Sequence, residues 1–107
     1  MNRELSFLSL ARKAGRLEYG EDPVSAALAS GKAKLLVYAS DASPRTVKWA
    51  ARDAKERGIP SVCLDHTKEA LGMAIGRPPT AVATITDKGM AESFARRYGY
   101  GEQIQGP

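Results

Sequence analysis

The 107-residue sequence predicts a three-layer α/β/α sandwich with a central mixed sheet of about four strands. Two observations support this fold class. Segments whose apolar residues follow helical spacing alternate along the chain with short, nearly continuous apolar runs. Glycines or helix-capping residues separate these segments. Strands that alternate with helices in this way form one sheet with helices on both faces.

The segments with helical spacing begin at capping residues or end at glycines. The first helix is predicted over residues 3–14. In the second we expect Asp22 at the N-cap and Pro23 at the first helical position, where the missing N–H costs no hydrogen bond. The other helices are expected to begin at Ser43, Thr67 and Asp87, and the glycines expected to end helices are Gly15, Gly31, Gly58 and Gly76.

Three apolar runs predict buried strands over residues 33–39, 59–65 and 80–86. The first run, AKLLVYA, is almost continuously apolar, which is typical of a strand buried on both faces. A hydrophobic content of 43% is enough for one compact domain of this length. We expect that domain to span residues 1–98, and residues 99–107, which lack a periodic pattern, to form a loose tail.

Composition narrows the class of protein. The formal net charge of +4 favours an anionic partner, although solvated surfaces often carry such a charge. The single cysteine, Cys63, lies in an apolar run, so we expect a buried, reduced thiol. No apolar run approaches the length of a signal-peptide core or a membrane span. These features predict a soluble, cytoplasmic protein.

Enzyme motifs are not found in the sequence. The segment ASGKAK contains a Gly31–Lys32 pair, but a phosphate-binding loop needs a glycine five residues before Gly31, where Ala26 stands, and a serine or threonine after Lys32, where Ala33 stands. His66 follows Asp65 at the end of a predicted strand, which allows an acid–base role, but a solvated turn histidine is favoured. We therefore predict no catalytic residue, no cofactor and no metal.

Basic residues gather in two clusters. One lies at spacings of three and four on one face of the predicted third helix: Arg45, Lys48, Arg52 and Lys55. The other lies at the end of the first helix: Arg12, Lys13 and Arg16. An ordinary solvated helix face explains the first cluster, and the helix dipole explains the second. Trp49, beside the first cluster, can stack on a base or be covered by neighbouring side-chain stems.

Several segments together resemble a known family. The segments are ARKAG, GED, AKLLVYASDAS, LGMAIGRP and VATITDKGMA. They are similar, in this order, to the superfamily of ribosomal proteins L7Ae, L30e and S12e, and most similar to its bacterial YlxQ-type branch. The resemblance covers residues 5–95.

The resemblance implies a non-catalytic protein that recognises structured RNA of the kink-turn type, on the ribosome or during its assembly. A kink-turn is an RNA helix bent sharply around a bulge and flanked by sheared guanine–adenine pairs. Ribosomal RNA is the implied partner, with ribosomal proteins as further partners. The residues implied to contact RNA are Lys13, Arg16, Gly20, Glu21, Asp22, Ser25, Lys32, Lys34, Ile75, Gly76, Arg77 and Pro78.

The resemblance also implies roles for some of these residues. Gly20 matches the family glycine that lets RNA approach the backbone, and Asp22 stands where many relatives have asparagine. A carboxylate here can accept hydrogen bonds from guanine N–H groups. Ile75 would offer an apolar surface to an extruded base, and Arg77 would contact a phosphate or stack on a base.

Two positions depart from the family pattern. Pro23 and Ala26 stand where relatives have glutamate and lysine, and Glu21 is the expected replacement acceptor. The departures favour an alternative function, a protein-interaction module that keeps the fold without the standard RNA site. A small-molecule role around Asp65 and His66 has the least support.

Overall fold

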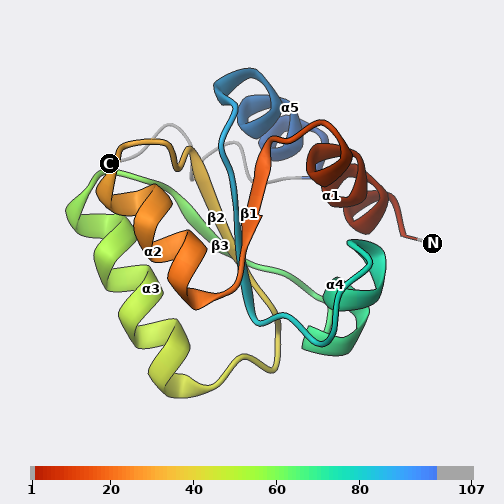
Figure 1. Ribbon diagram of the computed structural model, residues 1–107, viewed down its shortest axis with the longest axis horizontal. Coiled ribbons are helices and arrows are strands. Elements are labelled where there is room, and N and C mark those ends of the chain that lie inside the picture. The colour runs from red at the N-terminus through yellow and green to blue at the C-terminus, as the bar shows by residue number, and fades with distance from the viewer. Residues whose placement is uncertain (1, 99–107) are drawn as a thin grey trace.

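The computed structural model describes residues 2–98, so the predicted tail at 99–107 lies outside the described residues. Its helices are α1 (Arg3–Lys13), α2 (Glu21–Ala29), α3 (Pro44–Glu56), α4 (Lys68–Ala74) and α5 (Lys88–Tyr98). Its strands are β1 (Leu17–Tyr19), β2 (Leu35–Tyr38), β3 (Ser61–Cys63) and β4 (Val82–Ile85). Helices and strands alternate along the chain, as predicted (Figure 1).

The four strands form one mixed sheet in the order β1-β4-β2-β3. Strand β4 is antiparallel to β1 and β2, whereas β2 and β3 are parallel. Tyr19 lies opposite Ala83, and Tyr38 lies opposite Val82. The C-terminal ends of β1 and β2 therefore meet the beginning of β4. We call this end the Tyr19 end of the sheet, and the opposite end the Leu17 end.

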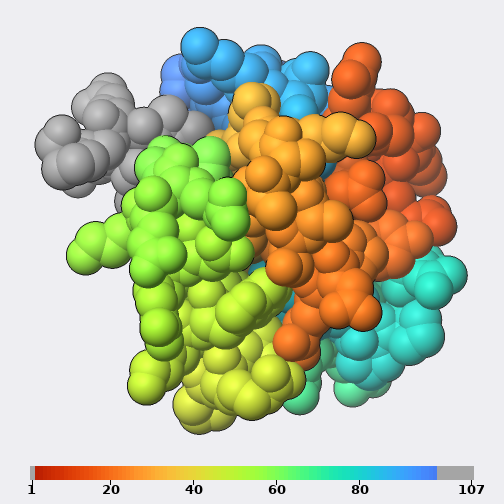
Figure 2. Space-filling view, turned by 60° about the vertical axis from the view of Figure 1, so that its left-hand side comes forward, coloured from red at the N-terminus to blue at the C-terminus, as the bar shows by residue number. Residues whose placement is uncertain are grey.

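Helices cover both faces of the sheet, which confirms the three-layer α/β/α sandwich. Helices α1, α4 and α5 pack on the face that carries Leu35 and Val37, and Phe94 of α5 is fully buried there. Helices α2 and α3 pack on the other face, where Leu36 is buried. This alternation of Leu35, Leu36 and Val37 follows the two-residue period of a strand. Figure 2 shows α2 and α3 side by side on one surface of the molecule.

Three predicted helix caps are confirmed. The side chains of Ser43, Thr67 and Asp87 each accept a hydrogen bond from the backbone N–H three residues later, at 3.2, 3.1 and 2.8 Å. Each bond satisfies a donor that the helix itself leaves without a partner. Within the described residues, no helix is long and apolar enough to cross a membrane.

The predicted N-cap of α2 is wrong. Helix α2 begins at Glu21 and its N-cap is Gly20, so Asp22 and Pro23 lie inside the first turn. Gly20 has φ 91° and ψ 158°, a conformation that is essentially restricted to glycine. Because β1 passes directly into α2, this sharp turn determines where the helix begins. The two carboxylates instead face the positive end of the helix dipole.

Two further expectations are also wrong. Cys63 is exposed rather than buried, because it ends the edge strand β3 and alternates with the buried Val62 and Leu64. Tyr38 of β2 lies opposite Cys63 in the sheet. Burial raises the pKa of the Tyr38 hydroxyl, and the neighbouring Cys63 raises this pKa further. His66 is not a solvated turn residue: its side chain is 17% exposed.

Candidate nucleic-acid interface

Two connections meet at the Tyr19 end of the sheet. Gly20 joins β1 to α2, and the α4–β4 loop, residues 75–81, joins α4 to β4. The backbone N–H of Gly20 donates a hydrogen bond to the carbonyl of Val82 at 3.0 Å. The start of α2 and the first residue of β4, which follows the α4–β4 loop, are thereby tied to each other.

The α4–β4 loop is held closely against α4 at Gly72. A Cβ atom at this position would overlap the carbonyl oxygen of Pro78 and lie 2.9 Å from that of Arg77. The Arg77 N–H donates to the Gly72 carbonyl at 2.8 Å, and the Thr80 hydroxyl donates to the Pro78 carbonyl at 2.8 Å. Only glycine leaves room for this backbone packing, so Gly72 positions the loop that carries Arg77.

Tyr19 carries two guanidinium groups over its ring. The Cζ atom of Arg77 lies 5.5 Å from the ring centroid, and that of Arg12, from α1, lies 5.6 Å from it. Within residues 2–98, neither arginine forms an ion pair with a carboxylate. Cation–π contacts hold these charges in place at about 0.5–1 kcal/mol each at exposed sites. The arrangement therefore presents two positive charges that an anion can bind.

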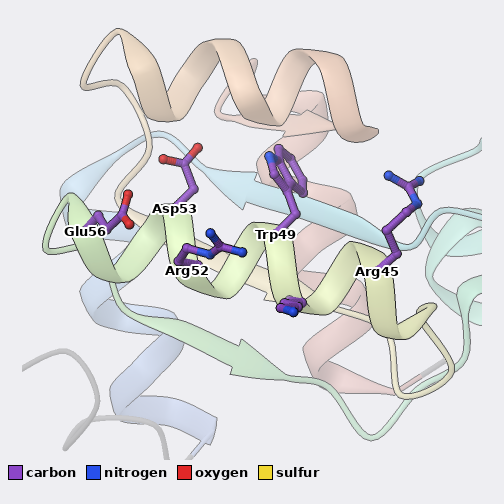
Figure 3. Close-up of a pocket in the computed structure, with 6 residues that line it drawn as sticks. Arg45, Trp49, Arg52, Asp53 and Glu56 are labelled. Carbon is purple, nitrogen blue, oxygen red and sulfur yellow. The ribbon is translucent and has the colours of Figure 1, made fainter.

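The two acidic residues of α2 have different environments. Arg45 of α3 donates hydrogen bonds to both carboxylate oxygens of Glu21, at 3.1 and 3.3 Å, and the Thr46 hydroxyl lies 3.4 Å from one of them. Figure 3 shows Arg45 pointing from α3 toward α2. Asp22 is exposed and forms no ion pair among the described residues. Asp22 rather than Glu21 thus has a carboxylate available to a ligand.

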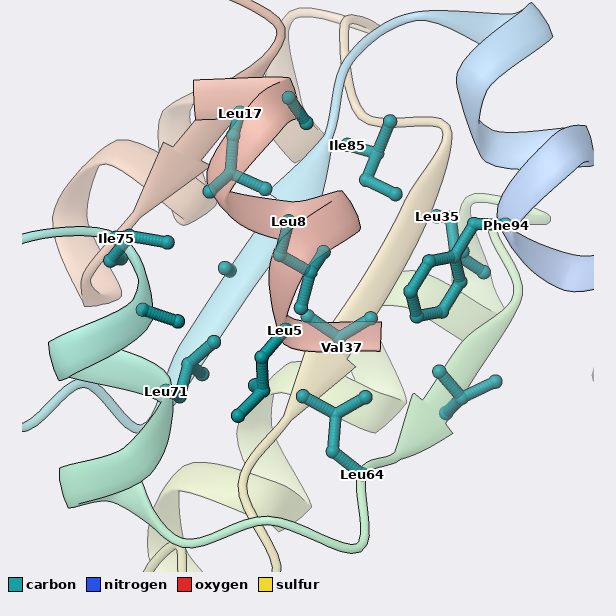
Figure 4. Close-up of a cluster of buried hydrophobic side chains, with 14 of the residues drawn as sticks. Leu5, Leu8, Leu17, Leu35, Val37, Leu64, Leu71, Ile75, Ile85 and Phe94 are labelled. Atoms are coloured by element: carbon teal, nitrogen blue, oxygen red, sulfur yellow. The ribbon is translucent and has the colours of Figure 1, made fainter. Parts of the chain in front are cut away.

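Ile75 does not have the surface position expected of it. Its side chain is 2% exposed and belongs to the apolar core around Leu8 and Leu71 (Figure 4). The residue ends α4 on the inner side of the helix, so it cannot contact an extruded base. Gly76, Arg77 and Pro78 are exposed, as the resemblance implies.

Several predicted cations lie away from this interface. The Arg16 carbonyl accepts the Thr86 N–H, and the Lys34 N–H donates to the Ile85 carbonyl, so both residues lie at the Leu17 end. The Lys34 ammonium donates to the Gly31 carbonyl at 3.1 Å. The nine residues of α2 separate the two ends by about 13 Å along the helix.

Three further residues were predicted to contact RNA: Lys13, Ser25 and Lys32. Exposed Lys13 ends α1, and exposed Lys32 follows the C-terminal end of α2. Half-buried Ser25 lies in the middle of α2. The Tyr19 end thus brings together Gly20, Glu21, Asp22, Gly76, Arg77 and Pro78, and adds Arg12 and Tyr19. Tyr19 directly precedes Gly20, which was the available signal for an aromatic residue at the interface.

Comparisons of the sequence identify relatives over most of its length. A model of the ribosomal protein L7Ae/L30e/S12e/Gadd45 family matches residues 5–95. The RNA-binding protein YlxQ of Bacillus subtilis is 31% identical over 87 residues, which cover 81% of this chain and 86% of YlxQ. The large ribosomal subunit protein eL8 of Haloquadratum walsbyi is 32% identical over 91 residues, which cover 83% of this chain and 75% of eL8.

Solved structures resemble the fold closely. A protein of unknown function from Bacillus halodurans matches with a TM-score of 0.83 and 28% identity, over 98% of this chain and 99% of that one. The 15.5kD RNA binding protein of Giardia lamblia matches with a TM-score of 0.78 and 26% identity, over 97% of this chain and 92% of that one.

Proposed function

Because the chain belongs to the ribosomal protein L7Ae/L30e/S12e/Gadd45 family, we propose that it is a non-catalytic RNA-binding protein that recognises structured ribosomal RNA of the kink-turn type. It would act in the cytoplasm, on the ribosome or during ribosome assembly. The observation that carries the proposal is the pair of guanidinium groups on Tyr19, beside Gly20 and the exposed carboxylate of Asp22.

Each group at the Tyr19 end has a role in this proposal. Arg12 and Arg77 bind phosphates, which position the RNA without reading its sequence. Gly20 has no side chain, so a nucleotide can approach the backbone there. The Asp22 carboxylate accepts hydrogen bonds from the N–H edge of an unpaired or sheared guanine. The RNA is thus recognised by its shape and by a few base-edge contacts.

Names of relatives support an RNA partner. YlxQ and the Giardia lamblia protein are described as RNA-binding, and eL8 is a component of the large ribosomal subunit. Other ribosomal proteins are proposed as neighbours on the same RNA.

A second candidate function is a protein-interaction module. It is favoured by the ion pair between Glu21 and Arg45, which occupies the acceptor expected to compensate for Pro23 and Ala26. This function predicts a stable protein partner in cells and no RNA after crosslinking.

The proposal is tested by titrating the protein with a kink-turn RNA and with the same RNA after its guanine–adenine pairs are replaced by Watson–Crick pairs. We expect tighter binding to the kinked RNA, and affinities for both RNAs that fall as salt rises, since bound phosphates release counterions. Equal affinities that do not change with salt would contradict both the reading of guanine and the phosphate contacts.

A further inference from the structure

A groove along α3 contains a second group of cations. An open hollow of about 430 Å³ is lined by one face of α3, at spacings of three and four residues: Arg45, Lys48, Trp49, Arg52, Asp53 and Glu56. We call it the α3 groove. In Figure 3, Arg45, Trp49 and Asp53 point from α3 toward α2. The α3 groove lies on the opposite face of the sheet from Arg12 and α4.

Positive charge predominates in the α3 groove. Asp53 is paired with Arg57 at 2.7 Å, and Arg45 is paired with Glu21. By contrast, Lys48 and Arg52, with Lys55 on the following turn, are exposed and form no ion pair within the part of the chain that the structure describes. Lys48 and Arg52 outnumber the single remaining lining carboxylate, that of Glu56, and Lys55, which does not line the groove, adds a positive charge beside it.

Trp49 adds an aromatic surface among these charges. Its side chain is half-buried against the apolar cluster beneath α2 and α3, and it also lines the groove. Packing on one side holds the indole while the other side stays accessible. Aromatic side chains beside cations are the usual elements of single-stranded RNA binding, because bases stack on the rings while the cations contact the backbone.

The α3 groove begins at the proposed interface. The bond between Arg45 and Glu21 joins the first turn of α3 to the first turn of α2, at the Tyr19 end. From there the 13 residues of α3 extend for about 20 Å toward the Leu17 end. A strand that leaves RNA bound at the Tyr19 end therefore meets the beginning of the groove at Arg45.

We propose that the α3 groove is a second RNA-binding surface, which takes a single-stranded segment flanking the structured RNA bound at the Tyr19 end. Lys48, Arg52 and Lys55 contact its phosphates, and Trp49 stacks on one of its bases. The inference rests on the proposed function for the identity of the RNA. A polyanionic strand fits this surface because the cations Lys48, Arg52 and Lys55 recur at spacings of three and four residues along α3.

The test compares a kink-turn RNA with the same RNA carrying a single-stranded extension of about eight nucleotides, within the site sizes known for such surfaces. The test variant is Lys48→Gln/Arg52→Gln. A matched control, Lys88→Gln/Arg96→Gln, changes two exposed cations of α5 on the other face of the sheet. Both variants lower the net charge by the same amount, from +4 to +2. Thermal unfolding of each variant checks that the fold is kept.

We expect the extension to tighten binding by the wild type and by the control. The α3 variant should lose this gain, and its salt slope with the extended RNA should fall by about 1.4, since each single-strand phosphate contributes about 0.7. Trp49 is the only tryptophan in the sequence, so its fluorescence should be quenched by the extended RNA and much less by the short one.

The outcomes separate the inference from the proposed function. If the wild type prefers the kink-turn but gains nothing from the extension, the α3 groove is not an RNA surface and the proposed function stands. If the α3 variant and the control lose the gain from the extension equally, net charge alone explains that gain and the inference is overturned. Gain from the extension without kink-turn preference would support the α3 groove and contradict the proposed function.

Discussion

The Tyr19 end and the α3 groove hold their cations in different ways. At the Tyr19 end, Arg12 and Arg77 come from distant parts of the chain and lie over one ring. In the α3 groove, Lys48 and Arg52 come from successive turns of one helix and have no cation–π contact or ion pair among the described residues. Side chains that are already held lose less conformational entropy on binding. The first surface is therefore suited to a fixed RNA shape, and the second to a strand of variable path.

Gly72→Ala should have the largest effect, and only on the Tyr19 end. The added methyl group overlaps the Pro78 carbonyl, so the α4–β4 loop must shift and displace Arg77. Overpacking of this kind costs about 1–3 kcal/mol, which urea unfolding measures. Kink-turn affinity should fall, whereas the gain from a single-stranded extension should remain. Gly89→Ala on α5, whose Cβ would meet only the Asp87 carboxylate at 3.3 Å, is the control. Equal unfolding curves for the two variants would contradict the role of Gly72.

Gly20→Ala should have the next largest effect. The φ of 91° is unfavourable for any residue with a Cβ, and such strain costs about 1–3 kcal/mol. The space around the position is sufficient, since the nearest atom to the added methyl group would be Pro23 Cδ at 3.7 Å. The loss of unfolding free energy should therefore come from the backbone conformation alone. An unchanged midpoint of urea unfolding would rule out this strain.

Arg12→Gln/Arg77→Gln should weaken RNA binding at the Tyr19 end with little effect on folding. Affinity should fall similarly for kinked and Watson–Crick RNA, and the salt slope should decrease by about 2, because each arginine contacts one phosphate. The titrations described above measure both quantities. A loss confined to the kinked RNA would mean that the arginines read a base instead.

Asp22→Ala should reduce the selectivity for kinked RNA more than the overall affinity for RNA. Because Asp22 lies in the first turn of α2 and does not cap it, its removal should cost only the dipole contribution, about 0.3–1 kcal/mol. The preference for kinked over Watson–Crick RNA should decrease, while the salt slope stays constant. Asp22→Asn is the matched control, since it keeps the shape and one acceptor oxygen. Unchanged selectivity in Asp22→Ala would remove Asp22 from the interface.

Arg45→Gln should have the smallest effect. The ion pair with Glu21 is solvent-exposed, with side-chain exposures of 76% and 43%, and such pairs contribute about 0.2–1 kcal/mol. If the pair withholds Glu21 from RNA, the variant should bind kinked RNA with at least wild-type selectivity. A decrease in selectivity would show that Arg45 itself contacts the RNA.

Most of the fold was predictable because its signals are local. Caps such as Ser43 and Thr67 and long apolar runs act through neighbouring residues. Strand β1 was not located because Leu17, Glu18 and Tyr19 form no continuous apolar run, whereas the equally short β3 lies within one. The preference of aspartate for an N-cap misplaced the start of α2, where the conformation available to Gly20 prevails.

The candidate interface was predictable only in part. Gly20, Asp22 and Arg77 were identified through the resemblance and lie together. The placement of Arg12 beside Arg77 depends on how α1 and α4 pack on the sheet, which no short pattern encodes. Ile75 was misassigned because its position at the end of α4 faces the core.

The position of β4 in the sheet determines when the Tyr19 end can form during synthesis of the chain. Strand β4 is the last of the strands within residues 2–98, yet it is the neighbour that joins β1 to the rest of the described sheet. A growing chain therefore contains Tyr19 and Gly20 long before they can be fixed at the edge of the sheet. The Tyr19 end assembles only after Val82–Ile85 has left the ribosomal exit tunnel. Incomplete chains consequently lack the Tyr19 end, the surface with which the finished protein would bind RNA.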